Sequence, residues 1–211
     1  MAVTVRKGRV SRAARREEIA RKLFAAAEQL LAEGTGFAEI SVEQLITGAE
    51  IARSTFYVYF EDKGSLLMEL AERVTQKVGE AADAWFSLPA GSTPEDLKVA
   101  LKQIADAYAA HRYLLAAVVE TATYDPRVRA QFTGVMERRA EDLRVGFRGQ
   151  QEAGFIPAEI DVAIVAPWLT WMIERGLYEL TSTGADVDGR LDGMTTVVWR
   201  TLYAPTAQGL N

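Results

Sequence analysis

The sequence predicts an all-α protein, with a small N-terminal domain of three helices and a larger C-terminal helical bundle. Alanine and leucine are abundant, and 49% of the residues are hydrophobic. Apolar residues recur three and four positions apart, the spacing that places them on one face of a helix. The alternation typical of a half-buried strand is rare, and glycine and proline fall mostly between the periodic runs, where they end helices and start turns.

A basic arm opens the chain. Residues 1–16 contain six basic side chains and no acidic one, a charge of +6; since the whole chain carries −5, the remaining residues carry −11. Such concentrated positive charge on an acidic protein can engage phosphate groups, and a solubilising tail is the alternative. The basic residues are Arg6, Lys7, Arg9, Arg12, Arg15 and Arg16.

The first long helix is expected over residues 13–33, followed by a pair of short helices. Its apolar face comprises Ile19, Leu23, Phe24, Ala27, Leu30 and Leu31. Ser41 followed by Gln44 is the capping-box pattern of a helix start. Gly48 is expected to break that helix, and a second short helix is expected over Arg53–Tyr59. Two short helices joined by a tight turn form a helix-turn-helix, whose second helix can lie in the major groove of DNA.

The segments SVEQLI and STFYVYF, followed by the pair Asp62-Lys63, resemble the DNA-binding region of the TetR family of transcriptional regulators. The chain departs from the family pattern at two positions. Glu50 stands where the family usually has a turn glycine, so a strained residue is expected there. Ala52 stands where the family usually has a serine, and losing that capping hydroxyl costs about 1 kcal/mol.

The start of the second short helix, where side chains reach base edges or phosphates, carries Arg53. Its guanidinium can bind guanine O6 and N7, or a phosphate, and both remain open. The resemblance implies phosphate contacts by Tyr57 and Tyr59. Lys63, at the N-terminus of the next helix, is interpreted as a phosphate clamp. Ser41 is expected to cap its helix and, by the resemblance, to contact phosphate. The predicted DNA-binding residues are Ser41, Arg53, Ser54, Thr55, Tyr57, Tyr59 and Lys63.

The chain is expected to divide into the arm (1–16), a helix-turn-helix domain (17–64) and a ligand-binding and dimerisation domain (65–211). The last of these begins within a long helix predicted from Asp62 to about Phe86. Residues 88–92 are expected to form a loop by composition. The later helices are predicted over 93–108, 111–122, 126–153, 161–183 and 187–203, with a kink at Pro167.

The two C-terminal helices are apolar around more than one face. A helix that is apolar all round must be buried all round, so one face is expected to meet a partner. The resemblance implies a homodimer with a four-helix interface, whose two DNA-binding domains meet a near-palindromic operator in double-stranded DNA.

A narrower resemblance, to the EthR-like (ethionamide-resistance regulator) subgroup, rests on segments 172–178 and 198–203. It implies a repressor with a long, largely apolar ligand tunnel. Ile173 replaces an asparagine of the subgroup and Arg139 replaces an aromatic residue, so the ligand chemistry is expected to differ. Plain core packing is the alternative for each aromatic residue. The predicted lining is Leu97, Ile104, Tyr108, Phe132, Met136, Arg139, Thr170, Ile173, Glu174, Tyr178 and Trp199.

Enzymatic chemistry has little support in the sequence. His111 is the only histidine and cysteine is absent. No phosphate-binding loop, dinucleotide fingerprint or metal-ligand spacing occurs, so neither cofactor nor metal is predicted. No run approaches the length of a membrane span, and a cytoplasmic protein is expected.

The sequence therefore predicts a homodimeric transcriptional regulator, expected to be a repressor released from its operator by a hydrophobic small-molecule effector. Two alternatives remain. One is a helical carrier or enzyme for hydrophobic small molecules with a vestigial helix-turn-helix, and the other is a structural dimerisation module.

Overall fold

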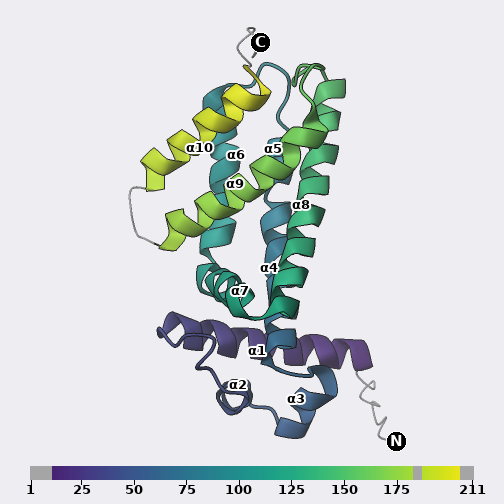
Figure 1. The fold of residues 1–211 in the computed structure, drawn as a ribbon. Helices are drawn as coiled ribbons and strands as arrows, with labels where there is room; N and C mark the ends of the chain where they lie inside the picture. The colour runs from purple at the N-terminus through teal and green to yellow at the C-terminus, as the bar shows by residue number, and fades with distance from the viewer. Residues whose placement is uncertain (1–10, 183–186, 205–211) are drawn as a thin grey trace, which may run out of the picture. The chain divides into compact units, whose positions relative to one another are not determined.

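The computed structural model describes residues 11–182 and 187–204, and within these ranges the chain forms α-helices joined by short loops, without strands (Figure 1). The all-α prediction is confirmed. The chain divides into two compact units, residues 1–70 and residues 71–211. The boundary thus follows Leu70, whereas the sequence suggested a boundary after Gly64; both positions lie within one helix. Arg6, Lys7 and Arg9 of the basic arm lie outside the described residues.

Unit 1 holds α1 (Arg12–Ala32), α2 (Val42–Gly48), α3 (Arg53–Tyr59) and the first residues of α4 (Lys63–Glu80). The predicted capping box at α2 is confirmed: the Ser41 hydroxyl accepts the Gln44 N–H at 3.2 Å, and Gln44 Oε1 accepts the Ser41 N–H at 2.8 Å. The core of the unit is apolar and fully enclosed. It includes Leu23, Phe37, Ile40, Leu45, Phe56, Phe60, Leu66 and Leu67.

The turn between α2 and α3 has the two expected departures from ideal geometry. Glu50 has a φ of 52°, and it is the only residue other than glycine with positive φ in the part of the chain that the structure describes. Ala52 occupies the N-cap of α3 without a side-chain hydrogen bond. Nearby, a Cβ on Gly48 would lie 3.0 Å from the Ala26 Cβ, so glycine allows α2 to approach α1 closely.

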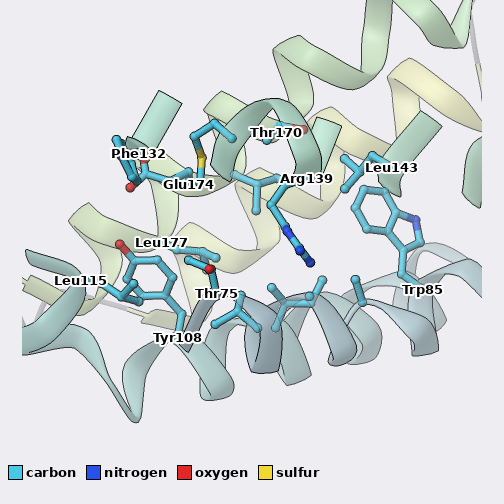
Figure 2. A pocket seen from close by; sticks show the side chains of 16 residues that line it. Thr75, Trp85, Tyr108, Leu115, Phe132, Arg139, Leu143, Thr170, Glu174 and Leu177 are labelled. Atoms are coloured by element: carbon cyan, nitrogen blue, oxygen red, sulfur yellow. The ribbon is translucent and has the colours of Figure 1, made fainter. Parts of the chain in front are cut away.

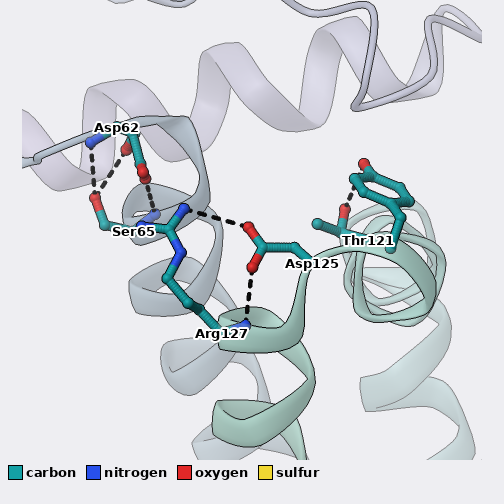
Figure 3. A network of polar contacts seen from close by, with 6 residues as sticks. Asp62, Ser65, Thr121, Asp125 and Arg127 are labelled. Carbon is teal, nitrogen blue, oxygen red and sulfur yellow. Dashed lines mark hydrogen bonds and ion pairs between the residues drawn. The ribbon is translucent and has the colours of Figure 1, made fainter.

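Asp62 caps the start of α4. Asp62 Oδ1 accepts the Ser65 N–H at 2.7 Å, and the Asp62 N–H donates to the Ser65 hydroxyl at 3.2 Å (Figure 3). A similar cap begins α8 in unit 2, where Asp125 Oδ1 accepts the Arg127 N–H at 2.8 Å.

The prediction of one continuous helix from Asp62 to Phe86 is wrong. The helix α4 ends at Glu80, and a separate turn, α5, covers Asp83–Phe86. At the break, the Ala82 N–H donates to the Gly79 carbonyl at 2.9 Å. The two residues are three positions apart, which is the spacing of a 3₁₀ turn and not that of an α-helix. The break coincides with full burial of Trp85, whose indole N–H donates to the Tyr203 hydroxyl at 2.8 Å.

Unit 2 continues with α6 (Pro94–Ala109), α7 (Arg112–Tyr124), α8 (Pro126–Glu152), α9 (Val162–Ser182) and α10 (Val187–Leu202). These bounds lie close to the predicted ones, and the Thr93–Asp96 capping box before α6 is present. The helix α9 packs along α8, and α10 packs on α6 and α9 (Figure 1). Within the described ranges, no helix combines the length and hydropathy needed to cross a membrane.

Candidate nucleic-acid interface and ligand cavity

The helix α3 presents its polar side outward and is held by one fully buried side chain. Phe56 is the only residue of α3 that is buried, whereas Arg53, Ser54, Tyr57 and Val58 are exposed. The Phe56 ring packs at a tilt against the buried Phe60 ring, with 5.6 Å between the two ring centroids. The segment of residues 41–60 is called the reading head below. Its outer face offers donors and a cation at the surface of unit 1.

Each predicted DNA-binding residue except one has an accessible polar group. Arg53 forms an exposed ion pair with Glu43 at 3.3 Å, and its guanidinium lies 5.6 Å from the Tyr57 ring centroid. An exposed pair of this kind contributes little and is readily exchanged for a phosphate or a base edge. Thr55 and Tyr59 are half-buried, and Ser41 is exposed but already serves as a cap.

Lys63 is the exception. Its ammonium donates to three backbone carbonyls, those of Phe37 at 2.9 Å, Ala38 at 2.7 Å and Ile40 at 2.9 Å. These bonds use all three ammonium N–H groups. Partial burial lowers the pKa of Lys63. In this arrangement Lys63 fastens the loop before α2 to the start of α4 instead of reaching outward.

Unit 2 contains an apolar cavity with a volume of about 100 Å³ (Figure 2). Its walls come from α4, α5, α6, α7, α8 and α9. The lining residues are Thr75, Val78, Gly79, Ala82, Trp85, Ile104, Tyr108, Leu115, Phe132, Met136, Arg139, Leu143, Thr170, Ile173, Glu174 and Leu177. An apolar cavity with a few polar groups is typical of a small-molecule site, although drug-sized ligands need about 300 Å³ or more.

The structure brings eight of the eleven predicted ligand-binding residues to the wall of this cavity. They are Ile104, Tyr108, Phe132, Met136, Arg139, Thr170, Ile173 and Glu174. Three others lie elsewhere: Leu97 is fully buried in the core, Tyr178 packs against the Arg175 guanidinium, and Trp199 packs against Tyr203.

The residues that α4 contributes to the cavity were missed by sequence reasoning. Thr75, Val78 and Gly79 recur at spacings of three residues and one residue and form one stripe of α4, and Ala82 follows just beyond the end of that helix. The helical spacing of these residues could be seen in the sequence, but small side chains on a helix make only a weak apolar pattern. The remaining missed residues are Trp85, Leu115, Leu143 and Leu177.

Two polar groups of the wall have shifted pKa values. Burial raises the pKa of the Glu174 carboxyl, against the opposing effects of the Arg175 charge and the Tyr108 hydroxyl. Burial is also the main cause that raises the pKa of Tyr108, and the charge of Glu174 adds to it. The Tyr108 hydroxyl is buried without a hydrogen bond of ordinary length. In the described part of the chain, no cluster of His, Asp and Glu could hold a metal ion.

An apolar surface lies along α9. Ile164, Trp168 and Trp171, spaced four and three residues apart, are 64%, 76% and 42% exposed. Val197 of α10 is also exposed, and Gly193 on the same helix has open space where a Cβ would lie. Exposed tryptophans at helical spacing are unusual on a monomer, and an exposed apolar patch of this kind is typical of interaction surfaces.

The comparisons with known protein families cover both units. Residues 23–70 match the model of the bacterial regulatory proteins of the tetR family. Residues 97–204, more than half of the chain, match the model of the C-terminal domain of the transcriptional regulator EthR. The chain belongs to the TetR family of transcriptional regulators and is EthR-like. The two matches fall separately on the helix-turn-helix of unit 1 and on the helices of unit 2.

Known relatives of this TetR-family regulator agree with the family match. The HTH-type transcriptional regulator EthR of Mycolicibacterium smegmatis is 29% identical over 157 residues, covering 72% of this chain and 70% of that protein. EthR of Mycobacterium tuberculosis is 26% identical over 157 residues, covering 74% and 72%. These relatives are transcriptional regulators and not enzymes.

A similar fold occurs among solved structures of the TetR family. The fatty acid degradation regulator FadR of Bacillus halodurans superimposes with a TM-score of 0.69 at 18% identity, covering 90% of this chain and 97% of that one. A protein of Syntrophomonas wolfei described as a TetR-family regulator gives a TM-score of 0.73 at 17% identity, covering 92% and 99%. At these identities the likeness concerns the fold alone.

Proposed function

We propose that this TetR-family regulator binds a near-palindromic DNA operator as a homodimer, represses transcription there, and is released by a small apolar effector. The observation that carries the proposal is the outward presentation of α3. Its exposed Arg53, Ser54 and Tyr57 stand on an α-helix, an element that the major groove is wide enough to admit, and Phe56 fixes that helix to the core.

The roles within the reading head follow from the chemistry of each side chain. Arg53 can make two parallel hydrogen bonds, so it serves as the base-reading or phosphate-binding cation. Ser54, Thr55, Tyr57 and Tyr59 offer hydroxyl donors suited to phosphate oxygens. Contacts to phosphate fix the register and orientation of the protein on DNA, whereas an Arg53 contact to guanine would add sequence preference.

The homodimer rests on the apolar surface of α9. A two-fold interface places the same patch of each chain against its copy, so a stripe carrying Trp168 and Trp171 is self-complementary in composition. Two chains would present two copies of α3 to half-sites about one helical turn apart.

Release by an effector follows from α4, which runs through both units. Thr75, Val78 and Gly79 of α4 line the cavity, and Lys63 at the other end of α4 holds the loop before α2. A ligand that binds one position of α4 more tightly shifts the population toward that position. We expect that position to separate the two reading heads beyond the spacing of successive major grooves.

A gel-shift titration with DNA from upstream of the protein's own gene tests the proposal. The wild-type protein is expected to retard this DNA, to resist competition by unrelated duplex, and to lose affinity in the Arg53→Ala variant. Ser87→Ala, on an exposed residue of unit 2, serves as the matched control. A protein that binds no duplex at low salt would contradict the proposal and favour the carrier or enzyme alternative.

A further inference from the structure

The wall of the cavity contains two charged side chains, Arg139 and Glu174, in an otherwise apolar or hydroxyl-bearing lining. Their surroundings differ. Figure 2 shows Glu174 and Tyr108 on one side of the cavity, with Arg139 projecting between Thr170 and Thr75. The difference decides which ligand charge the cavity accepts.

The charge of Arg139 is neutralised from outside the cavity. Its Nη1 forms an ion pair with Asp142 at 3.0 Å, and the guanidinium passes over Gly79, where a Cβ would lie 2.0 Å from Nη1. Arg139 also borders an outer hollow of unit 2 that contains Asp142, Glu80 and Asp83. One carboxylate, Asp142, therefore pairs with Arg139, and two more line the same hollow, while the Arg139 Nε is buried without a hydrogen bond.

The carboxyl of Glu174 has no such partner. Among the described residues it forms no ion pair: the neighbouring Arg175 is committed to Glu179 at 2.5 Å and also lies over the Tyr178 ring. The polar side chain that affects this carboxyl most directly, apart from Arg175, is Tyr108. Its hydroxyl is buried and has no hydrogen-bond partner within the usual distance. A partly buried carboxyl without a cation is unfavourable, and a ligand cation would relieve it.

Aromatic rings adjoin this carboxyl. Tyr108 and Phe132 both line the cavity with Glu174, and Phe132 is fixed by edge contact with Trp171 at 5.9 Å between centroids. An ammonium group beside aromatic faces and a carboxylate gains both a cation–π contact and an ion pair. An anion would instead meet the Glu174 carboxylate, and the only cation among the described residues of the wall, Arg139, is already paired with Asp142.

We propose that the cavity binds a small ammonium ligand, an amine with a short apolar body, and that Glu174 is its counter-ion. The inference rests on the proposed function, because it names the chemical class of the effector. The volume of about 100 Å³ limits the apolar body. A cavity of about 150 Å³ holds benzene, so a chain of about four carbon atoms is the right size.

The test uses n-butylamine, n-butanol and butyrate, which share one apolar chain and differ in charge. Calorimetric titration of the full-length protein without DNA is expected to show binding of butylammonium at pH 7, at least tenfold tighter than butanol or butyrate. Glu174→Gln keeps the side-chain shape and is expected to remove this preference. Glu137→Gln, an exposed acid of α8 with the same change in charge, is the matched control and is expected to keep it.

Arg139→Gln separates the two charged residues. It is expected to bind butylammonium more tightly than the wild type, because it removes a positive charge from the wall. Equal binding of the three compounds, or butyrate binding that Arg139→Gln abolishes, would overturn the proposal. Circular dichroism and melting of each variant report folding independently of binding.

A second readout separates this inference from the proposed function. Operator release is measured by adding butylamine to the protein–DNA complex. Tight amine binding with an intact complex would leave the ligand class standing and contradict effector-driven release. Release by butanol and butyrate as readily as by butylamine would support release and contradict the ligand class.

Discussion

The reading head and the ligand cavity are both built from packed helices, but they differ in how completely the space between the helices is filled. In the reading head, Phe56 is fully buried, the Ser41–Gln44 box closes the start of α2, and Lys63 fastens the preceding loop. In unit 2 the helices leave about 100 Å³ unfilled. Dense packing holds one shape, whereas unfilled space leaves room for a ligand to favour another. Under the proposed function, shape is fixed where DNA is to be read and left adjustable where an effector is to act.

Removing the anchor of α3 is expected to have the largest effect. Phe56→Ala deletes a fully buried ring and should lower the free energy of unfolding by about 3–5 kcal/mol, with loss of DNA binding. Val58→Ala, on the exposed side of the same helix, should change stability by less than about 0.5 kcal/mol. Urea denaturation of both variants checks the difference. Equal effects would mean that α3 is not held through Phe56.

A substitution of Lys63 tests whether this side chain holds the loop before α2 in place or contacts a phosphate. Lys63→Met removes three charge-assisted hydrogen bonds and should destabilise the protein by about 1.5–3 kcal/mol. DNA affinity should fall through the misplaced reading head, while the slope of log affinity against log salt stays unchanged. A slope reduced by about 0.9 would instead identify a lost phosphate contact.

The turn before α3 offers two ways to sharpen the contrast. Glu50→Gly removes the strain of positive φ and should stabilise the protein by about 1 kcal/mol. Ala52→Ser adds the missing cap hydroxyl and should contribute about 1 kcal/mol as well. Thermal melting of the single and double variants measures both effects. Destabilisation by either change would show that Glu50 or Ala52 makes a stabilising contribution that outweighs the strain or the missing cap.

In the cavity, the stability effect of Glu174 is expected to be the smallest and to depend on pH. Burial raises the pKa of this carboxyl above its ordinary value of 4.5, so the folded state holds the proton more tightly than the unfolded state. The wild type therefore loses stability as pH rises from 4.5 toward the raised pKa. Glu174→Gln should be more stable than the wild type at pH 7, with the difference shrinking as pH falls toward 4.5. A constant difference across this range in urea denaturation would contradict the assignment.

Features that depend on neighbouring residues could be predicted from the sequence, whereas features that depend on contacts between distant residues could not. The capping box at Ser41 and the helix Arg53–Tyr59 depend on residues within a few positions of each other, and both are confirmed. The end of α4 depends instead on partners far along the chain. Gln150 donates to the Trp85 carbonyl at 2.7 Å and accepts from the Tyr203 hydroxyl at 2.8 Å, a closed arrangement that no local pattern indicates.

The cavity shows the same limit. The resemblance to the EthR-like subgroup indicated most of the helices that line it, yet Leu97 and Trp199 lie in packed regions away from it. A resemblance in sequence does not specify which side chains fill the space between the helices. The stripe of Thr75, Val78 and Gly79 on α4 was missed for the opposite reason. These residues make a weak apolar pattern in the sequence, and only the structure shows that α8 and α9 line the same cavity.

The central claim is that α3 is offered to DNA twice in each assembly. Hydroxyl-radical footprinting of the protein on its operator, at a stoichiometry fixed by sedimentation, tests it most directly. The account predicts two chains per site and two protected major-groove patches, about 10 base pairs from centre to centre or a multiple of that spacing. A single protected patch under one bound chain, or no protection at any salt concentration, would contradict it.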